Sequence, residues 1–309
     1  MGFNPLPHLR GAFTISVFTL NVVFWFIPII IVGLAKLLVP ASAWRDLMSR
    51  WLSALGENWI SCNGLILALT QSIEWDVEGN TGLARRGWYL VVSNHQSWVD
   101  ILVLQKVFNR RIPFLKFFIK QQLIWVPFLG LAWWAMDMPF MRRFSREYLA
   151  KHPEMKGKDL EATRQACEKF ERIPTSIINF VEGTRVTPAK QRERESPYQY
   201  LLPPRAGGIA FVLGAMGGTL HDLLDVTIVY PDGAPSMWDL CCGQLQRVVV
   251  RISSQQIEPW LLHGDYQNDD GFRLRFQQWL AQMWAQKDDQ IGVILEQELG
   301  RTNQIEREP

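Results

Sequence analysis

Hydrophobic and polar residues divide the chain into two parts. Near the N-terminus, an apolar stretch runs from Gly11 to Ala35 without a charged residue, and Pro28 lies within it. A helix that crosses the hydrocarbon core of a bilayer needs about 20 residues, so this stretch is long enough. Pro28 predicts a kink or a division of that helix. The pattern favours a membrane helix, and a buried core helix is the alternative.

The next segment, from Ala41 to Gln71, mixes apolar and polar residues and carries three tryptophans near helical spacing. This pattern is typical of amphipathic helices that lie against another helix or a membrane surface. Its last part, Trp59 to Ile73, is apolar but short for a span, so a helical hairpin in the membrane is also consistent with the sequence. We therefore assign residues 1–75 to an N-terminal membrane-associated helical segment and residues 76–309 to a second domain.

Beyond residue 76, short apolar runs alternate with helical patterns. The expected strands are Trp88–Ser93, Ile112–Phe118, Ala135–Phe140, Thr175–Val181, Asp225–Tyr230 and Leu245–Ile257. The expected helices are Ser97–Phe108, Lys158–Arg172, Arg205–Met216 and the long C-terminal Asp269–Gln297, and a polar surface loop is expected over Val186–Pro204. Such alternation predicts an α/β fold with a mostly parallel sheet flanked by helices.

Composition narrows the possible partners. The formal net charge is only +2, which gives no electrostatic reason to expect a nucleic-acid partner. The four cysteines, Cys62, Cys167, Cys241 and Cys242, form no CxxC pair. They indicate thiols in a reducing compartment and no zinc site.

Charges around the apolar stretch predict an orientation. Lys36, Arg45 and Arg50 follow it, whereas Arg10 alone among Lys and Arg precedes it. Because positive residues concentrate on the cytoplasmic side of membrane proteins, the remainder of the chain is expected in the cytoplasm.

Two polar clusters follow expected strands. The first, NHQSWVD, runs from Asn94 to Asp100, and the second, FVEGTR, runs from Phe180 to Arg185. Open α/β sheets place their sites at the carboxyl ends of strands. Both clusters are therefore candidates for one site.

His95 and Asp100 have the residue types of a general base and its orienting carboxylate. Imidazole titrates near neutral pH, and a carboxylate on its second nitrogen fixes the tautomer. Five residues along a helix leave two side chains about 140° apart. The pair can meet only if His95 lies in the turn before the helix. The alternative is that Asn94 caps a helix beside a structural histidine.

The sequence Glu182-Gly183-Thr184-Arg185 suggests an anion site. Gly183 would allow a turn that exposes backbone N–H groups, and the Arg185 guanidinium offers a planar fork for phosphate. The alternative for Glu182 and Arg185 is a solvated surface ion pair.

These blocks together resemble the glycerolipid acyltransferase family, which includes the 1-acylglycerol-3-phosphate acyltransferases. The NHxxxxD block, KQQLIWVPFLG (Lys120–Gly130), the basic MRR (Met141–Arg143), LLPPRAGG, and VTIVYP (Val226–Pro231) occur in the family's order. The form NFVEGTR is similar to the lysocardiolipin-type branch. Met141 departs from the pattern, since many members carry Asp before the basic residue.

The resemblance implies roles for particular residues. His95 would be the general base and Asp100 its orienting carboxylate. The acceptor's head group would be held by Glu182, Gly183, Thr184 and Arg185, with Arg142 or Arg143 as a further phosphate contact. It also implies the glycerol-3-phosphate acyltransferase-like fold, with residues 76–309 as the acyltransferase domain. No metal and no cofactor are implied, because the acceptor oxygen attacks the thioester directly.

The implied reaction moves a fatty acyl group from acyl-CoA or acyl-carrier protein to lysophosphatidic acid and gives phosphatidic acid. The expected partners are the lysophospholipid acceptor, the acyl thioester donor and membrane lipids, and the expected location is a bacterial inner membrane. Three alternatives remain: a different lysophospholipid or glycerol 3-phosphate as acceptor, a non-catalytic lipid-binding protein, and an ester or thioester hydrolase that uses Ser97. The sequence His263-Gly264-Asp265 is a weaker catalytic candidate.

Overall fold

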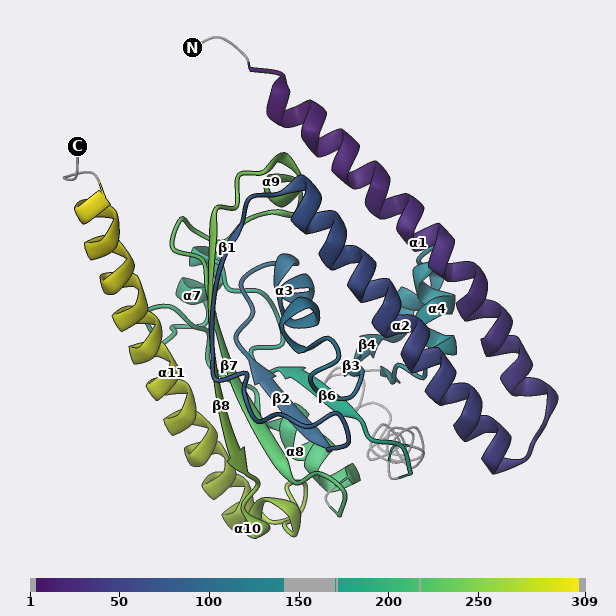
Figure 1. Ribbon diagram of the computed structural model, residues 1–309. Helices are drawn as coiled ribbons and strands as arrows, with labels where there is room; N and C mark the ends of the chain where they lie inside the picture. Colours follow the sequence, from purple (N-terminus) through teal and green to yellow (C-terminus); the bar gives the residue numbers. More distant parts are fainter. Residues whose placement is uncertain (1–3, 142–169, 171, 217, 306–309) are drawn as a thin grey trace.

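The structure is a computed structural model that describes residues 4–141, 170, 172–216 and 218–305. Two long helices come first and an α/β domain follows (Figure 1). In chain order the elements are α1 (Leu6–Leu38), α2 (Ser42–Thr70), β1 (Glu74–Glu78), β2 (Tyr89–Ser93), α3 (Val99–Phe108), β3 (Leu115–Phe117), β4 (Ile119–Lys120), η1 (Gln121–Trp125), α4 (Leu129–Ala135), β5 (Phe140–Met141), β6 (Ser176–Phe180), α7 (Pro188–Glu193), α8 (Ala206–Met216), β7 (Asp222–Val229), α9 (Met237–Cys242), β8 (Arg247–Gln256), α10 (Pro259–Leu262) and α11 (Asp270–Ile305).

The central sheet has six strands in the order β1-β8-β7-β2-β6-β3. Its neighbouring strands are parallel except for β7 and β8, which are antiparallel. The predicted α/β fold with a mostly parallel sheet is therefore confirmed. Because β2, β6 and β7 are parallel neighbours, the segments that follow them meet at one edge of the sheet.

Helices cover both faces of this sheet (Figure 1). On one face, α8 and α11 bury side chains such as Ile209, Phe276 and Trp284. On the other face, α3 packs Val99, Val103 and other apolar residues against the sheet. Such strands, buried on both sides, form as continuous apolar runs, which explains why YLVVS in β2 is fully buried.

The N-terminal helices form an antiparallel pair (Figure 1). Small residues let α1 approach its neighbours closely: Gly11 faces Cys242 in α9, and Gly33 faces Ala135 in α4. The helix continues through Pro28, so the predicted division at this residue is wrong. Contacts with α9 and α4 place both halves of α1 against the α/β domain.

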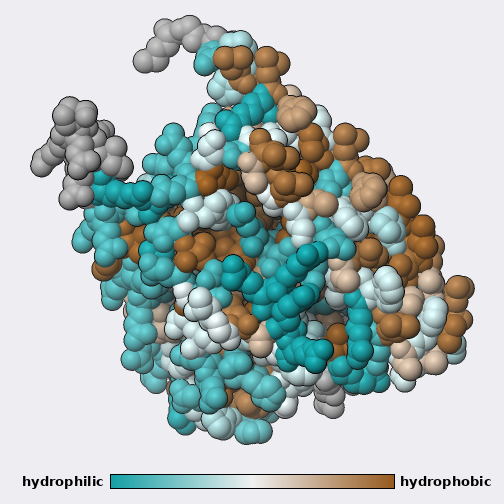
Figure 2. Space-filling model, in the orientation of Figure 1, coloured by the Kyte–Doolittle hydropathy of each residue, from teal (hydrophilic) through white to brown (hydrophobic). Residues whose placement is uncertain are grey.

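The outer face of α1 is hydrophobic. Figure 2 shows apolar side chains along the edge of the molecule that α1 forms. Among the described residues, α1 is the one helix long and apolar enough to cross a membrane, and 6% of its most apolar window is buried. The alternative of a buried core helix is therefore wrong for α1.

Three local predictions differ from the structure. Ala135–Phe140 is not a strand: Ala135 ends α4 and only Phe140 enters β5, because Asp137 adopts a left-handed backbone with a φ of 61°. The polar loop after residue 186 contains the short helix α7, which Thr187 caps through its side chain. The edge strand β1 was missed. The predicted helix Lys158–Arg172 lies almost entirely outside the described residues.

Candidate active site

The turn after β2 is held by the side chain of Asn94. Its Oδ1 accepts a hydrogen bond from the N–H of Ile228 at 2.9 Å, and its Nδ2 donates to the carbonyl of Ile228 at 2.8 Å. This buried amide therefore extends the pairing between β2 and β7 by one step. Asn94 caps no helix, so that alternative interpretation is wrong.

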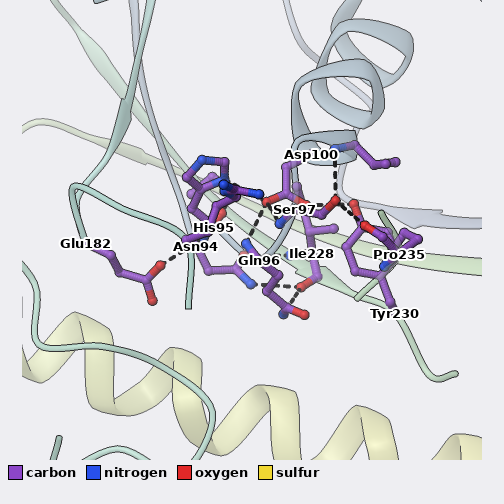
Figure 3. Close-up of polar contacts among 12 residues, drawn as sticks. Asn94, His95, Gln96, Ser97, Asp100, Glu182, Ile228, Tyr230 and Pro235 are labelled. Atoms are coloured by element: carbon purple, nitrogen blue, oxygen red, sulfur yellow. Dashed lines mark hydrogen bonds and ion pairs between the residues drawn. The ribbon is translucent and has the colours of Figure 1, made fainter. Parts of the chain in front are cut away.

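His95 and Asp100 meet in the way their spacing requires. His95 lies in the turn, Asp100 lies in the first turn of α3, and His95 Nδ1 is 2.8 Å from Asp100 Oδ2. Figure 3 shows both side chains directed toward each other. The contact predicted from the sequence is therefore confirmed.

The carboxylate of Asp100 is fully buried and surrounded by donors. Its Oδ2 accepts from the backbone N–H groups of Gln96 at 2.6 Å and Ser97 at 2.9 Å, and its Oδ1 accepts from the Tyr230 hydroxyl at 2.6 Å. With these donors around it, the carboxylate acts as an acceptor toward His95 as well. We therefore infer that the His95 proton sits on Nδ1, which leaves Nε2 able to accept a proton.

One face of the His95 ring is covered by Phe180. The two ring centroids are 4.0 Å apart and the planes differ by 17°. The side chain of His95 keeps 13% of its exposure. Stacking on the face and the hydrogen bond at the edge together fix the orientation of the imidazole.

Glu182 links the two clusters from inside the protein. Its Oε2 accepts from the backbone N–H of His95 at 3.0 Å, and its Oε1 accepts from that of Leu202 at 3.1 Å. Its side chain is fully buried, so the alternative of a surface ion pair is wrong. Burial raises the pKa of Glu182 to about 8, while the two backbone N–H groups oppose the shift. The carboxyl group supports the turn at His95 and is closed to a head group.

The remaining residues of this cluster are less buried: Gly183 is exposed, and Thr184 and Arg185 are half-buried. Gly183 adopts a φ of 69°, a conformation that favours glycine, and its N–H donates to the carbonyl of Phe180. Lys190 donates to the Thr184 hydroxyl at 2.7 Å. The Arg185 guanidinium lies 4.9 Å from the ring centroid of Trp98. The turn also returns to the first cluster, because the N–H of Val186 donates to the carbonyl of His95 at 2.8 Å.

Two other catalytic candidates lose support. The hydroxyl of Ser97 donates to the carbonyl of Pro235 and accepts from the N–H of Val99, so it is not held as a nucleophile by His95. His263 is exposed at the end of α10, and Asp265 accepts from the backbone N–H groups of Gln267 and Asn268 in its own turn. Neither forms a catalytic pair.

Arg142 and Arg143 lie outside the described residues, and their predicted phosphate contact stays a prediction. Among the residues that the structure does describe, no three His, Cys, Asp or Glu side chains form a group that could hold a metal ion. The sequence analysis missed Tyr230, Trp98 and Phe180. All three lie within or beside the recognised blocks, but only the folded chain shows that they contact Asp100, Arg185 and His95.

Comparison with known proteins gives a family for this arrangement. The family model described as Acyltransferase matches residues 74–231, just over half of the chain. These residues include both clusters and β1, which we had not expected.

Individual relatives point the same way. The chain is 23% identical over 210 residues to the 1-acyl-sn-glycerol-3-phosphate acyltransferase gamma of Mus musculus, a match that covers 61% of this chain and 53% of the mouse protein. The Homo sapiens protein of that name is 23% identical over 205 residues, a match that covers 60% of this chain and 52% of the human protein. The chain thus spans about half the length of these curated relatives.

A solved structure is similar in fold. It is the 1-acyl-sn-glycerophosphate (LPA) acyltransferase PlsC from Thermotoga maritima, with a TM-score of 0.53 and 15% sequence identity. The superposition covers 93% of this chain and 98% of that one. The likeness therefore includes the N-terminal helices as well as the sheet.

Proposed function

The chain belongs to the acyltransferase family, and on that premise we propose that it is a membrane-bound O-acyltransferase that converts lysophosphatidic acid into phosphatidic acid. The donor is a fatty acyl thioester of coenzyme A or of acyl-carrier protein. The observation that carries the proposal is the pair formed by His95 and Asp100. His95 Nδ1 lies 2.8 Å from Asp100 Oδ2, which leaves His95 Nε2 for a substrate.

The proposed step needs no covalent intermediate with the protein. His95 Nε2 takes the proton of the acceptor hydroxyl while its oxygen attacks the thioester carbonyl. Collapse of the tetrahedral intermediate breaks the carbon–sulfur bond, and the proton passes from Nε2 to the departing thiolate. Asp100 holds the tautomer and stabilises the imidazolium that forms in between.

The proposed acceptor site is the outward part of the second turn. Arg185 offers a bidentate contact to a phosphomonoester, and beside it Gly183 is exposed and Thr184 is half-buried. Arg142 and Arg143 are further proposed contacts from the resemblance. Within the family, the form NFVEGTR favours the lysocardiolipin-type branch, with a resemblance to the bacterial acyltransferase called YihG.

The membrane part of the proposal rests on α1. Large side chains such as Leu20, Phe24 and Leu38 are more than 60% exposed, which costs roughly 1–3 kcal/mol each in water. Lipid contact would remove this cost. Because both halves of α1 contact the α/β domain, we propose that it lies along the membrane surface instead of crossing it. The resemblance adds a bacterial inner membrane with the site toward the cytoplasm.

The test is transfer of labelled oleoyl from its CoA thioester by membranes that contain wild type, His95→Ala or the control His263→Ala. Lysophosphatidic acid, lysophosphatidylglycerol and glycerol 3-phosphate are supplied in parallel, and each assay is repeated with acyl-carrier protein as donor. The proposal predicts transfer to lysophosphatidic acid that only His95→Ala abolishes. His95-dependent transfer to another acceptor overturns the substrate. No His95-dependent transfer with either donor favours a lipid-binding protein, and release of free fatty acid without an acceptor favours a hydrolase.

A further inference from the structure

The sheet register brings Tyr230 to the first turn of α3. Strand β7 runs parallel to β2, with Val226 opposite Ser93, the last residue of β2. The backbone of β7 therefore continues alongside the turn that carries His95. Because side chains alternate along a strand, Val226, Ile228 and Tyr230 share one face, and all three pack in the cluster that contains α3.

Tyr230 is buried there, with 3% of its surface exposed, and its hydroxyl lies 2.6 Å from Asp100 Oδ1. Figure 3 shows the phenol on the side of Asp100 opposite His95. Burial, and after it the Asp100 charge, raise the pKa of Tyr230 well above its usual value. The phenol thus keeps its proton and acts as the donor in this hydrogen bond.

We propose that Tyr230 is a positioning residue of the transfer site, which acts on His95 through the carboxylate of Asp100. Its hydroxyl occupies Oδ1, so that Oδ2 alone faces His95 and the backbone donors. It also withdraws charge from the carboxylate and so moderates how strongly Asp100 favours the protonated imidazole. The role in transfer rests on the proposed function, whereas the effect on His95 does not.

Other titratable groups face the same pair. Glu182, just beyond β6, accepts from the backbone N–H of His95, and burial, with the Asp100 charge adding to it, raises the pKa of Glu182. Lys287 of α11 is buried, and its charge acts in turn on Glu182. Both are unchanged in a Tyr230 variant, so a difference between that variant and wild type reports on the phenol.

The first measurement is the pH profile of kcat/KM for wild type, Tyr230→Phe and the matched control Tyr89→Phe. Tyr89 is also buried, and its hydroxyl accepts from the N–H of Ala84 at 2.9 Å, away from the pair. In Tyr230→Phe the less neutralised carboxylate should favour the imidazolium. The acidic limb of the kcat/KM profile should then move to higher pH by about half a unit, which lowers kcat/KM near neutral pH by up to about 3-fold. Tyr89→Phe should keep the wild-type limb.

A second substitution should shift the acidic limb of the kcat/KM profile in the opposite direction. Incorporation of 3-fluorotyrosine at position 230 keeps the volume but makes the phenol a stronger donor, so the limb should move to lower pH. This arm also applies if Tyr230→Phe fails to fold. A limb that stays with wild type in the variants that fold overturns the proposal, since a packing role alone would not shift it.

An NMR titration of the histidine ring nitrogens separates this inference from the proposed function. The His95 resonances are assigned by their loss in His95→Ala, and their titration is compared between wild type and the two Tyr230 variants. Shifts of opposite sign in a protein that transfers no acyl group would support the inference and defeat the proposed function. Identical His95 titrations in an active enzyme would do the reverse.

Discussion

The turns at residues 94–100 and 182–185 follow neighbouring parallel strands, yet they treat their polar groups differently. In the first turn, Asp100 is fully buried and His95 keeps 13% of its side-chain exposure. In the second, Glu182 points inward, while Gly183 is exposed and Arg185 stacks on Trp98, which is itself 51% exposed. The first turn is closed around its hydrogen bonds and the second is open on one side.

The difference suggests a division of labour, in which the first turn carries out proton transfer and the second binds the acceptor. Proton transfer depends on geometry fixed before the substrate arrives, and a buried, fully bonded carboxylate supplies it. Recognition of a large acceptor needs donors that remain accessible. Glu182 joins the two turns, because it accepts from the backbone of His95 while Gly183, which follows it, is exposed.

Asp100→Asn should break the closed turn. An amide would place its own N–H groups against the donors from Gln96, Ser97 and Tyr230, and it would no longer fix the His95 tautomer. We expect kcat to fall about 10³- to 10⁴-fold and the free energy of unfolding to fall by about 2–4 kcal/mol. Steady-state kinetics and denaturant unfolding in detergent would measure both. Near-normal kcat would contradict a closed catalytic turn.

Glu182 predicts a pH dependence of stability. Its pKa of about 8 in the folded protein lies above the ordinary value of 4.5, so between these values the folded state binds a proton that the unfolded state lacks. The free energy of unfolding should therefore fall as pH rises from about 4.5 to 8, by roughly 2–4 kcal/mol. Glu182→Gln should remove this slope, whatever its stability at a single pH. If the free energy of unfolding depends on pH in the same way in wild type and Glu182→Gln, the raised pKa of the buried Glu182 is contradicted.

Arg185→Gln should affect the open turn. Loss of the bidentate contact to phosphate should raise the KM for lysophosphatidic acid about 10- to 100-fold, with kcat changed little. Monoacylglycerol, which lacks the phosphate, is the control acceptor and should be used equally well by both proteins. An equal effect on both acceptors would show that Arg185 does not read the phosphate.

Trp98→Ala should have the smallest effect. Removal of the indole frees the Arg185 guanidinium to move, so the acceptor KM should rise about 3-fold. Trp98→Phe keeps an aromatic face, so its acceptor KM should lie between those of wild type and Trp98→Ala. A Trp98→Ala variant with the wild-type KM would mean that the stacking does not order Arg185.

The sequence predicted the sheet, the position of both turns and the meeting of His95 with Asp100, because these follow from local patterns and from parallel strands. It could not predict the inward direction of Glu182, which depends on the backbone of Leu202 and His95, the latter 87 residues earlier in the chain. The Tyr230 contact with Asp100 joins residues 130 apart. Such contacts are set by sheet register, which no local pattern carries.

Errors in the elements have similar causes. A strand was expected over Ala135–Phe140 because a short apolar run does not distinguish strand from helix. The edge strand β1 was missed because its sequence, EWDVE, is rich in acids. Asp76 is paired with Arg247 and Arg251 of β8, so these charges are partnered across strands that lie far apart in the sequence.

The most direct test of the division of labour is a side-by-side measurement of kcat and acceptor KM for purified His95→Ala and Arg185→Gln with lysophosphatidic acid. We predict that His95→Ala lowers kcat about 10³-fold with the acceptor KM little changed, whereas Arg185→Gln raises the KM and leaves kcat near wild type. If His95→Ala retains most of its kcat, or if both variants change the same parameter, the two turns do not divide chemistry from binding.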